Sequence, residues 1–404
     1  MKNKYMPTAI SLYINYFVHG MGAIIMAQNM DFLTKQLHTD TTGVAYVISA
    51  LGIGRLLVLF VSGVLSDKFG RKPFVFTGMA IYALFFAGIL VAPNVSVAFI
   101  FALLAGMANS ILDSGTYPAL MESFPETPGT ANVIIKAFIS AGQFALPLII
   151  SMLISGDLYY GYSFLLCIAI FIVNGLVLSR LKFPDHKVQA APAASSESGS
   201  DSKFRNKPNF WIEGICLILI GYTATATFYL ISVWLPKYGE QVIQMSKTSS
   251  LQLISYYSIG SLLAVFVTSY LVKSLVRPVT FVLLYPFISF VALLVLWQVR
   301  TPLVCVISAF VIGFSAAGGV LQLALTTMSE LFPSSKGKIT GIVYTASSLA
   351  TFSIPVITGI LSKTSISNII LFDAIVTFVG VLLAIIVNMR YRRVINPVSA
   401  GVQA

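Results

Sequence analysis

Long apolar runs recur along the whole chain, separated by short polar segments. A helix that crosses a bilayer needs roughly 20 mostly apolar residues. We predict twelve such runs, at residues 8–34, 43–66, 73–92, 97–124, 132–155, 160–181, 209–236, 249–272, 278–299, 303–331, 339–362 and 367–389. Because 57% of the residues are hydrophobic and only 10% are charged, a soluble domain could not keep this apolar surface from water. The sequence therefore predicts an all-α, multi-pass membrane protein.

The basic residues lie in the short loops and predict the orientation. Of the 25 Lys and Arg residues, 19 fall on the side of the N-terminus, five fall on the other side, and Arg55 lies within a run. The positive-inside rule then places both termini in the cytoplasm. The net charge of +11 is spread over these loops, a pattern that argues against nucleic acid as a partner. We expect a monomer in the cell membrane, either inner or plasma membrane.

A polar segment divides the chain nearly in half. Residues 182–208 include a run of small and polar residues and are expected to form a flexible cytoplasmic linker. The linker separates a six-helix bundle at 1–181 from a second bundle at 209–391, and 392–404 would be a cytoplasmic tail. Six residues of the first half recur at an offset of 208: Glu122, Phe124, Pro125, Gly129, Phe144 and Pro147 match Glu330, Phe332, Pro333, Gly337, Phe352 and Pro355. This recurrence indicates an internal duplication.

The loop after the second run carries a specific motif, which reads Gly63-Val64-Leu65-Ser66-Asp67-Lys68-Phe69-Gly70-Arg71-Lys72. It resembles the loop motif of the major facilitator superfamily, Gly-x-Leu-(Ala/Ser)-Asp-(Arg/Lys)-x-Gly-Arg-(Arg/Lys). With the duplication and the topology, the resemblance covers essentially the whole chain. It implies two pseudo-symmetric six-helix bundles with a solute site near the midplane between them.

The same resemblance implies a cytoplasmic gate. Glu122 would pair with Arg71 or Lys72, and its repeat mate Glu330 would pair with Arg277. In physical terms, Gly63 permits close helix approach, Asp67 can cap a facing helix, and Gly70 permits a tight turn. The alternative is that these charges only fix the topology, because surface ion pairs are often weak.

Two departures bear on the subfamily. Proton-driven drug antiporters of the family usually carry a Gly-Pro pair in the fifth span, whereas here Gly142 and Pro147 stand apart. Many proton-coupled members carry an arginine in the fourth span, where this chain has the acid Asp113. These features weaken the drug-antiporter interpretation and bear a weak likeness to fucose-permease-type proton symporters.

Ionisable groups inside a bilayer are costly and are functional candidates by default. Asp113 is the leading candidate for proton coupling, since a carboxylate in an enclosed cavity can exchange protons near working pH. Arg55 is its expected partner, either as a structural counter-ion or as a ligand for a substrate carboxylate or phosphate. His19 is a second proton-coupling candidate, with a neutral hydrogen-bonded role as the alternative. Glu213 and Asp373 are expected near the interfaces, where snorkelling or capping would explain them.

Neutral polar and aromatic side chains form stripes at helical spacing on several runs. Each stripe alone is more often helix–helix contact than ligand contact, but their recurrence on equivalent runs predicts a polar, aromatic-lined cavity. The expected substrate-binding residues, besides Arg55, are Asn29, Asn109, Tyr117, Gln143, Tyr222, Tyr229, Gln252, Tyr256, Gln322 and Tyr344.

These features predict a secondary transporter that moves a small polar solute, a sugar, polyol or organic acid, by proton-coupled alternating access. The alternatives are a proton-driven multidrug efflux antiporter and a membrane sensor or scaffold without transport. The chain has no phosphate-binding Gly-Lys-Ser/Thr loop and no metal-ligand spacing, so we expect no enzyme activity, cofactor or metal.

Overall fold

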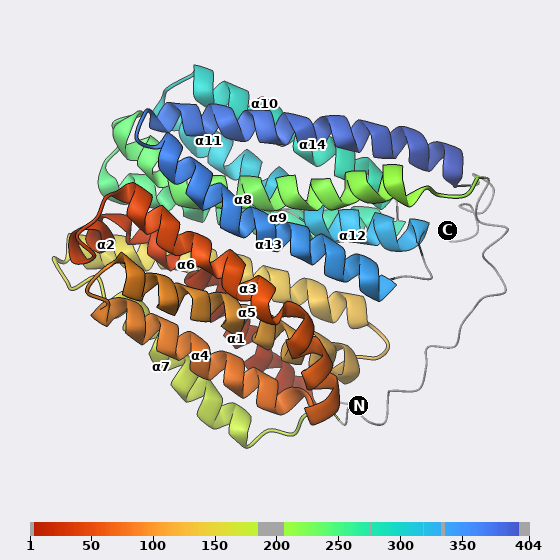
Figure 1. The fold of residues 1–404 in the computed structure, drawn as a ribbon, viewed down its shortest axis with the longest axis horizontal. Coiled ribbons are helices and arrows are strands. Elements are labelled where there is room, and N and C mark those ends of the chain that lie inside the picture. Colours follow the sequence, from red (N-terminus) through yellow and green to blue (C-terminus); the bar gives the residue numbers. More distant parts are fainter. Residues whose placement is uncertain (1–3, 185–205, 275, 318, 333–335, 396–404) are drawn as a thin grey trace.

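A computed structural model describes residues 4–184, 206–274, 276–317, 319–332 and 336–395, and the predicted all-α class is confirmed (Figure 1). Within these ranges, twelve helices are long and apolar enough to cross a membrane. Most of the expected linker, 185–205, and the end of the expected tail, 396–404, lie outside the described residues, as does Pro333 of the repeat.

The first half contains six membrane-length helices and one short helix. These are α1 (Met6–Gln28), α2 (Met30–Gln36), α3 (Thr41–Phe69), α4 (Arg71–Val91), α5 (Val95–Ser123), α6 (Pro128–Ser155) and α7 (Tyr162–Ser179). The first apolar run was expected to continue to residue 34, but the helix breaks at Asn29, and α2 begins one residue later.

The second half repeats the arrangement, with π-helical turns at two places. Its elements are η2 (Phe210–Gly214), α8 (Ile215–Gln241), α9 (Lys247–Ser274), α10 (Pro278–Gln298), α11 (Pro302–Ile312), η3 (Gly313–Ala317), α12 (Val320–Leu331), α13 (Lys336–Leu361) and α14 (Ile366–Val394). Segments α11, η3 and α12 form one membrane-length unit. Helix α14 continues to Val394, into the segment expected to be a tail.

Side-chain caps and a glycine turn set several helix ends. The carboxylate of Asp40 accepts a hydrogen bond from the Gly43 amide at the start of α3, and Asn94 caps α5 in the same way. These caps satisfy backbone donors that the first helical turn leaves unpaired. Gly70 joins α3 to α4 with a φ of 92°, a conformation that other residues adopt at a cost.

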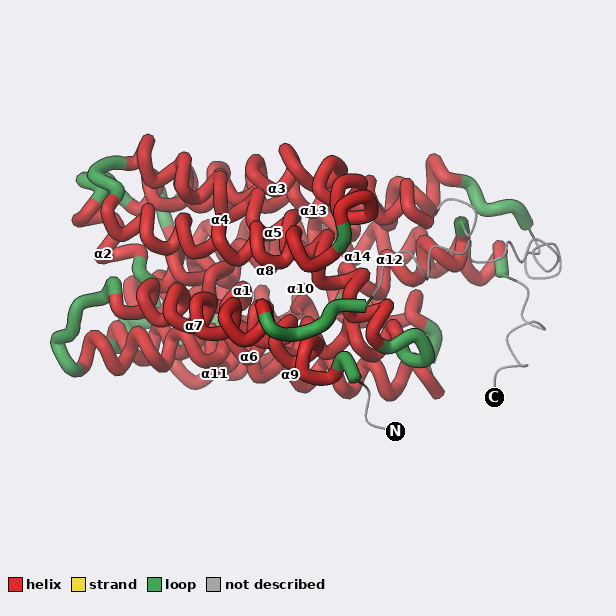
Figure 2. The backbone as a smooth tube through the Cα atoms, turned by 90° about the horizontal axis from the view of Figure 1, so that it is seen from below, coloured by secondary structure: helices red, strands yellow, loops and turns green. Residues whose placement is uncertain are grey.

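Helix α1 begins and α14 ends at the same end of the bundle, here called the terminal end, whereas α2 lies at the opposite end (Figure 1). The two halves lie against each other with their helices running roughly along the same direction (Figure 2). They meet mainly through two helix pairs, α3 with α13 and α6 with α9. Each pair joins one helix from each half, so the surfaces between the halves are built by equivalent helices.

The pair α3 and α13 is closed toward the opposite end and open toward the terminal end. The Thr42 hydroxyl donates a 2.8 Å hydrogen bond to the Gly359 carbonyl, and Gly52 lies directly against the backbone at Phe352. By contrast, a side chain added at Gly63 or Gly341 would have nothing within 4 Å. The structure is therefore a state in which these helices separate toward the terminal end.

Candidate functional site

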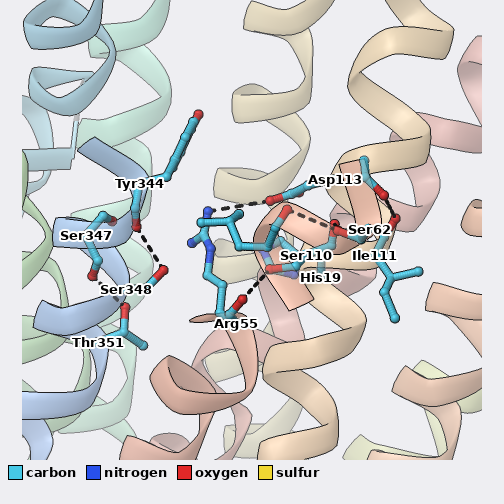
Figure 3. A network of polar contacts seen from close by, with 12 residues as sticks. His19, Arg55, Ser62, Ser110, Ile111, Asp113, Tyr344, Ser347, Ser348 and Thr351 are labelled. Atoms are coloured by element: carbon cyan, nitrogen blue, oxygen red, sulfur yellow. Dashed lines mark hydrogen bonds and ion pairs between the residues drawn. The ribbon is translucent and has the colours of Figure 1, made fainter. Parts of the chain in front are cut away.

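An arginine and an aspartate of the first half face each other (Figure 3). The guanidinium of Arg55 on α3 lies 3.5 Å from the carboxylate of Asp113 on α5, and both side chains are partly exposed. The hydroxyl of Tyr16 on α1 donates a 2.5 Å hydrogen bond to the same carboxylate. Three helices therefore converge on Asp113.

Close packing of α3 against α5 places this pair. Gly54 lies against the carbonyl of Leu103, and Gly106 lies against the carbonyl of Leu51, so a side chain at either glycine would strike backbone. Small residues at such crossings allow helices to approach closely in membranes. One turn beyond this contact, Ser110 donates a 3.0 Å hydrogen bond to the carbonyl of Arg55. Arg55, which follows Gly54, is therefore held in position relative to Asp113.

Aromatic side chains from both halves surround the pair. The Tyr344 ring on α13 lies 5.4 Å from the Arg55 guanidinium carbon, a cation–π contact between the halves. Tyr117 packs edge-on against Tyr16, with ring centroids 5.7 Å apart. Tyr229 on α8 lies within electrostatic reach of Arg55. The site therefore combines charges from the first half with aromatic rings from the second.

His19 lies next to this group on α1. Its Nδ1 is 2.7 Å from the hydroxyl of Tyr82 on α4, and its ring packs edge-on against Tyr16 at 5.5 Å. Tyr16 therefore contacts both proton-coupling candidates. The sequence interpretation did not single out Tyr16, although it lies three residues before His19 and so shares its helix face.

The other expected substrate-binding residues are dispersed. Asn29 donates hydrogen bonds to the Ile25 carbonyl and to Ser163 on α7, and Tyr222 pairs with Ser353 across α8 and α13. Within the described residues, no hydrogen bond or ion pair joins Arg55 or Asp113 to these two or to Asn109, Gln143, Gln252, Tyr256 or Gln322. Gln143 is buried, Asn109 and Gln252 are half-buried, and Tyr256 and Gln322 are exposed.

Lys136 on α6 was counted with the loop residues by sequence, but it belongs to a membrane-length helix. It is half-buried and acts electrostatically on His19. Among the described residues, no hydrogen bond or ion pair to its ammonium is found. Lys136 lies seven residues before Gln143, so it shares a helix face with this expected substrate-binding residue.

The motif residues form an ion-pair network within the first half. Arg71 binds Asp67 at 2.5 Å and Glu122 at 3.0 Å. Lys72 instead donates to the carbonyls of Ser179 and Leu181 at the end of α7. Of the two partners that the family resemblance implied for Glu122, Arg71 and Lys72, the structure pairs it with Arg71.

Two other gate residues, Glu330 and Gly63, do not make the contacts expected of them in this state. In the described part of the chain, Glu330 forms no ion pair with Arg277 and instead accepts a 2.9 Å hydrogen bond from the Tyr391 hydroxyl. A side chain at Gly63 would meet nothing within 4 Å, so no helix packs closely against this glycine in this state.

A second ion-pair network joins the halves at the opposite end. We name it the Asp31 cluster, comprising Asp31, Lys237, Glu240 and Lys247. Lys237 on α8 binds Asp31 on α2 directly and Glu240 at 3.0 Å, and Lys247 on α9 binds Asp31 at 3.0 Å. Burial alone would raise the pKa of Asp31, but the hydrogen bonds and charges of the two lysines lower it below its ordinary value of 3.8.

Comparisons with known proteins agree with this architecture. A family model described as Major Facilitator Superfamily matches residues 12–355. Inner membrane transport protein YdiM of Escherichia coli (strain K12) is 50% identical over 393 residues, which cover 97% of this chain and 96% of that protein. The uncharacterized MFS-type transporter YfkL of Bacillus subtilis (strain 168) is 46% identical over 394 residues, covering 97% and 98% of the two chains.

Among solved structures, the crystal structure of a D-xylose-proton symporter matches with a TM-score of 0.75. The match covers 95% of this chain and 97% of that chain at 14% sequence identity. At this identity the likeness concerns the fold alone.

Proposed function

Because this chain belongs to the major facilitator superfamily and is a multi-pass membrane transporter, we propose that it moves a small polar organic solute by proton-coupled alternating access. The solute would be a sugar, polyol or organic acid. The observation that carries the proposal is the partly exposed Arg55–Asp113 pair, which faces the aromatic ring of Tyr344 from the other half.

Asp113 is proposed to carry the proton and Arg55 to bind the solute. An ionised Asp113 is held by Arg55 and Tyr16. When Asp113 takes up a proton, its attraction for the guanidinium falls, and Arg55 becomes available to a carboxylate or hydroxyl of the solute. Protonation and solute binding then favour each other, which is the condition for coupled transport.

The charges that act on His19 favour an organic acid within the proposed class. Arg55 and Lys136 are both positive and both act electrostatically on His19, whereas Asp113 is the acid that pairs with Arg55. Protonation of Asp113 would leave Arg55 without its carboxylate partner, and no ion pair to Lys136 is found among the described residues. A solute carboxylate would supply the missing charge, whereas a lipophilic cation would be repelled.

The proposed cycle uses contacts at both ends of the molecule. The Asp31 cluster would hold the halves together at the opposite end, while α3 and α13 are apart at the terminal end. With both termini in the cytoplasm, as proposed from the basic loops, this is an inward-facing state in the cell membrane. Closing α3 against α13 and opening the Asp31 cluster would complete the exchange of access.

The test is a solute screen in proteoliposomes loaded with a pH-sensitive dye. Pools of sugars, organic acids, amino acids and lipophilic cations are added to the parent protein and to Arg55→Gln. The proposal predicts a proton movement with a polar pool, strongest with the acids, that Arg55→Gln removes. A response to lipophilic cations alone would favour multidrug efflux instead, and no response to any pool would favour a sensor or scaffold.

A further inference from the structure

A lysine without an ion-pair partner lies on a membrane-length helix of the first half. Lys136 belongs to α6, which packs against α1 of its own half and against α9 of the other half. Its side chain is half-buried, and no hydrogen bond or ion pair to its ammonium is found among the described residues. A cation within a membrane-spanning helix is costly without an anion, so Lys136 is a functional candidate.

Two hydrogen bonds between α6 and α9 lead along the helices toward Lys136. The Ser255 hydroxyl donates a 2.9 Å hydrogen bond to the Phe144 carbonyl, and the hydroxyls of Ser140 and Ser261 lie 3.1 Å apart. Lys136 follows one turn beyond Ser140, toward the terminal end and on the same helix face. It therefore lies on the face of α6 that is directed at the second half.

Arg55 has an equivalent place on α3. Gly52 lies directly against the backbone at Phe352 on α13, and Arg55 follows one turn later toward the terminal end. Arg55 and Lys136 thus each lie one turn beyond a contact between the halves. The two cations stand on the two helices through which the first half meets the second.

Helix α1 connects the two cations. Gly20 lies directly against the carbonyl of Ile139 on α6, three residues after Lys136. His19 precedes Gly20, and both Arg55 and Lys136 act electrostatically on it. The two cations are therefore within reach of one residue and belong to one group of charges.

The second half supplies no compensating carboxylate to this group among the residues that act on Arg55. Those residues are Asp113 and Tyr117 of the first half and Tyr229 and Tyr344 of the second. Asp113 is thus the acid of the group, at 3.5 Å from the Arg55 guanidinium. When Asp113 is protonated, two positive charges remain.

The acid on α14 is enclosed elsewhere. Asp373 is 0% exposed, and its Oδ1 accepts a 2.8 Å hydrogen bond from Thr227 on α8. The sequence interpretation placed Asp373 near an interface, which is wrong because the helices of the second half enclose it. Asp373 therefore belongs to the interior of the second half.

We propose that the transported solute is an organic dianion, with one carboxylate bound by Arg55 and the other by Lys136. This inference rests on the proposed function, because it takes Asp113 as protonated while the solute is bound. Two carboxylates then match two cations, whereas one carboxylate would leave a cation uncompensated within the membrane. Lys136 is thus the residue that selects for the second carboxylate.

The test compares diacids with their monoesters on the purified protein in detergent at neutral pH. Malonate, succinate, glutarate and adipate are each paired with the monomethyl ester, which has nearly the same shape and one carboxylate fewer. The dependence of the Tm on ligand concentration gives each apparent dissociation constant, because a ligand of the folded state stabilises it. At least one diacid should bind about tenfold or more tightly than its ester.

Lys136→Gln should remove this preference. It should weaken binding of the preferred diacid by about tenfold or more and change binding of the ester by less than about twofold. Lys136→Arg should keep the preference, because it keeps the charge. Lys136→Met, which keeps the length of the side chain without its charge, serves the same purpose if the glutamine variant does not fold.

Lys182→Gln controls for the loss of one positive charge from the protein. Lys182 lies after α7 in the same half and is exposed, so its replacement should leave the diacid preference unchanged. The Tm without ligand is a second control. Lys136 forms no ion pair among the described residues, so Lys136→Gln should keep the parent value.

Three results would overturn the proposal: no diacid raises the Tm of the parent, the esters bind the parent as tightly as the diacids, or Lys136→Gln keeps the preference. The last result would show that Lys136 only extends to the membrane interface. Proton movement with the same diacids in proteoliposomes is measured separately. A diacid that binds through Lys136 and moves no protons would contradict the proposed coupling and leave the dianion site standing.

Discussion

Replacing Lys237 by glutamine should open the end of the molecule at which the two halves are joined. Lys237 is 9% exposed and binds Asp31, which belongs to the other half, while Lys247 also binds Asp31 at 3.0 Å. The substitution removes the most buried cation of the Asp31 cluster. It leaves Asp31 with Lys247 alone and leaves Glu240 without its partner.

The size of the effect follows from the burial of the two groups. Breaking a fully buried ion pair costs about 3–5 kcal/mol, and an exposed pair is worth less than about 1 kcal/mol. Asp31 is 30% exposed and retains Lys247, so we place the loss between these limits, at about 1–3 kcal/mol. That loss corresponds to an increase of about 5- to 150-fold in the population open at this end.

The assay is the rate at which a hydrophilic maleimide labels Ala45→Cys in membranes. Ala45 is fully buried and lies against Gly359 of the other half, so labelling requires separation at this end. The native cysteines Cys167, Cys216 and Cys305 are all buried, which keeps the background low. Lys237→Gln should raise the labelling rate by the factor derived above.

The matched control is Lys363→Gln. Lys363 pairs with Asp40 across the same end at 3.8 Å, but these side chains are 62% and 58% exposed. Its loss should change the labelling rate by less than about twofold, because an exposed pair contributes little. Equal rates for the two variants, or no change with Lys237→Gln, would refute the view that buried charge closes this end.

Three further predictions follow from the same structure. The two lysines lower the pKa of Asp31 below its ordinary value of 3.8. The contribution of Asp31 to closure is therefore fully present above pH 3.8 and is lost only as the pH falls through the lowered pKa. The rate of Ala45→Cys labelling, corrected for thiol ionisation, should be constant from about pH 8 to about pH 5. Gly54→Val should lower stability by about 1–3 kcal/mol or more, because the new side chain meets the Leu103 backbone, and its Tm in detergent should fall. A valine side chain at Gly63 would enter open space in this state, so Gly63→Val should keep the parent Tm. It should slow transport in proteoliposomes if α3 closes against α13 during the cycle. Normal transport by this variant would contradict this closure.

The fold was predictable because the bilayer allows few solutions. Backbone groups in lipid must be hydrogen-bonded internally, so each long apolar run has to be a helix. Helix ends were less predictable, since they depend on local detail. No proline or glycine lies at the break at Asn29, which separates α1 from α2, so the sequence carries no helix-breaking residue there.

The candidate site was predictable only where charge alone was informative. Arg55 and Asp113 stand out because ionised groups are rare in apolar runs, and the structure brings them together. The Asp31–Lys237 contact joins residues from opposite halves, and no periodicity within one helix reports such a pairing. Asp373 illustrates the same limit, because its burial depends on how neighbouring helices pack around it.

The measurement that tests the central claim most directly compares two activities of Asp113→Asn in proteoliposomes, using the solute that the screen identifies. Solute exchange between the two sides requires binding and the conformational change, whereas net proton movement also requires the proton carrier. We predict that Asp113→Asn retains exchange and loses solute-driven proton movement. Proton movement that persists in Asp113→Asn would show that Asp113 is a structural partner of Arg55 and that the proton travels by another group.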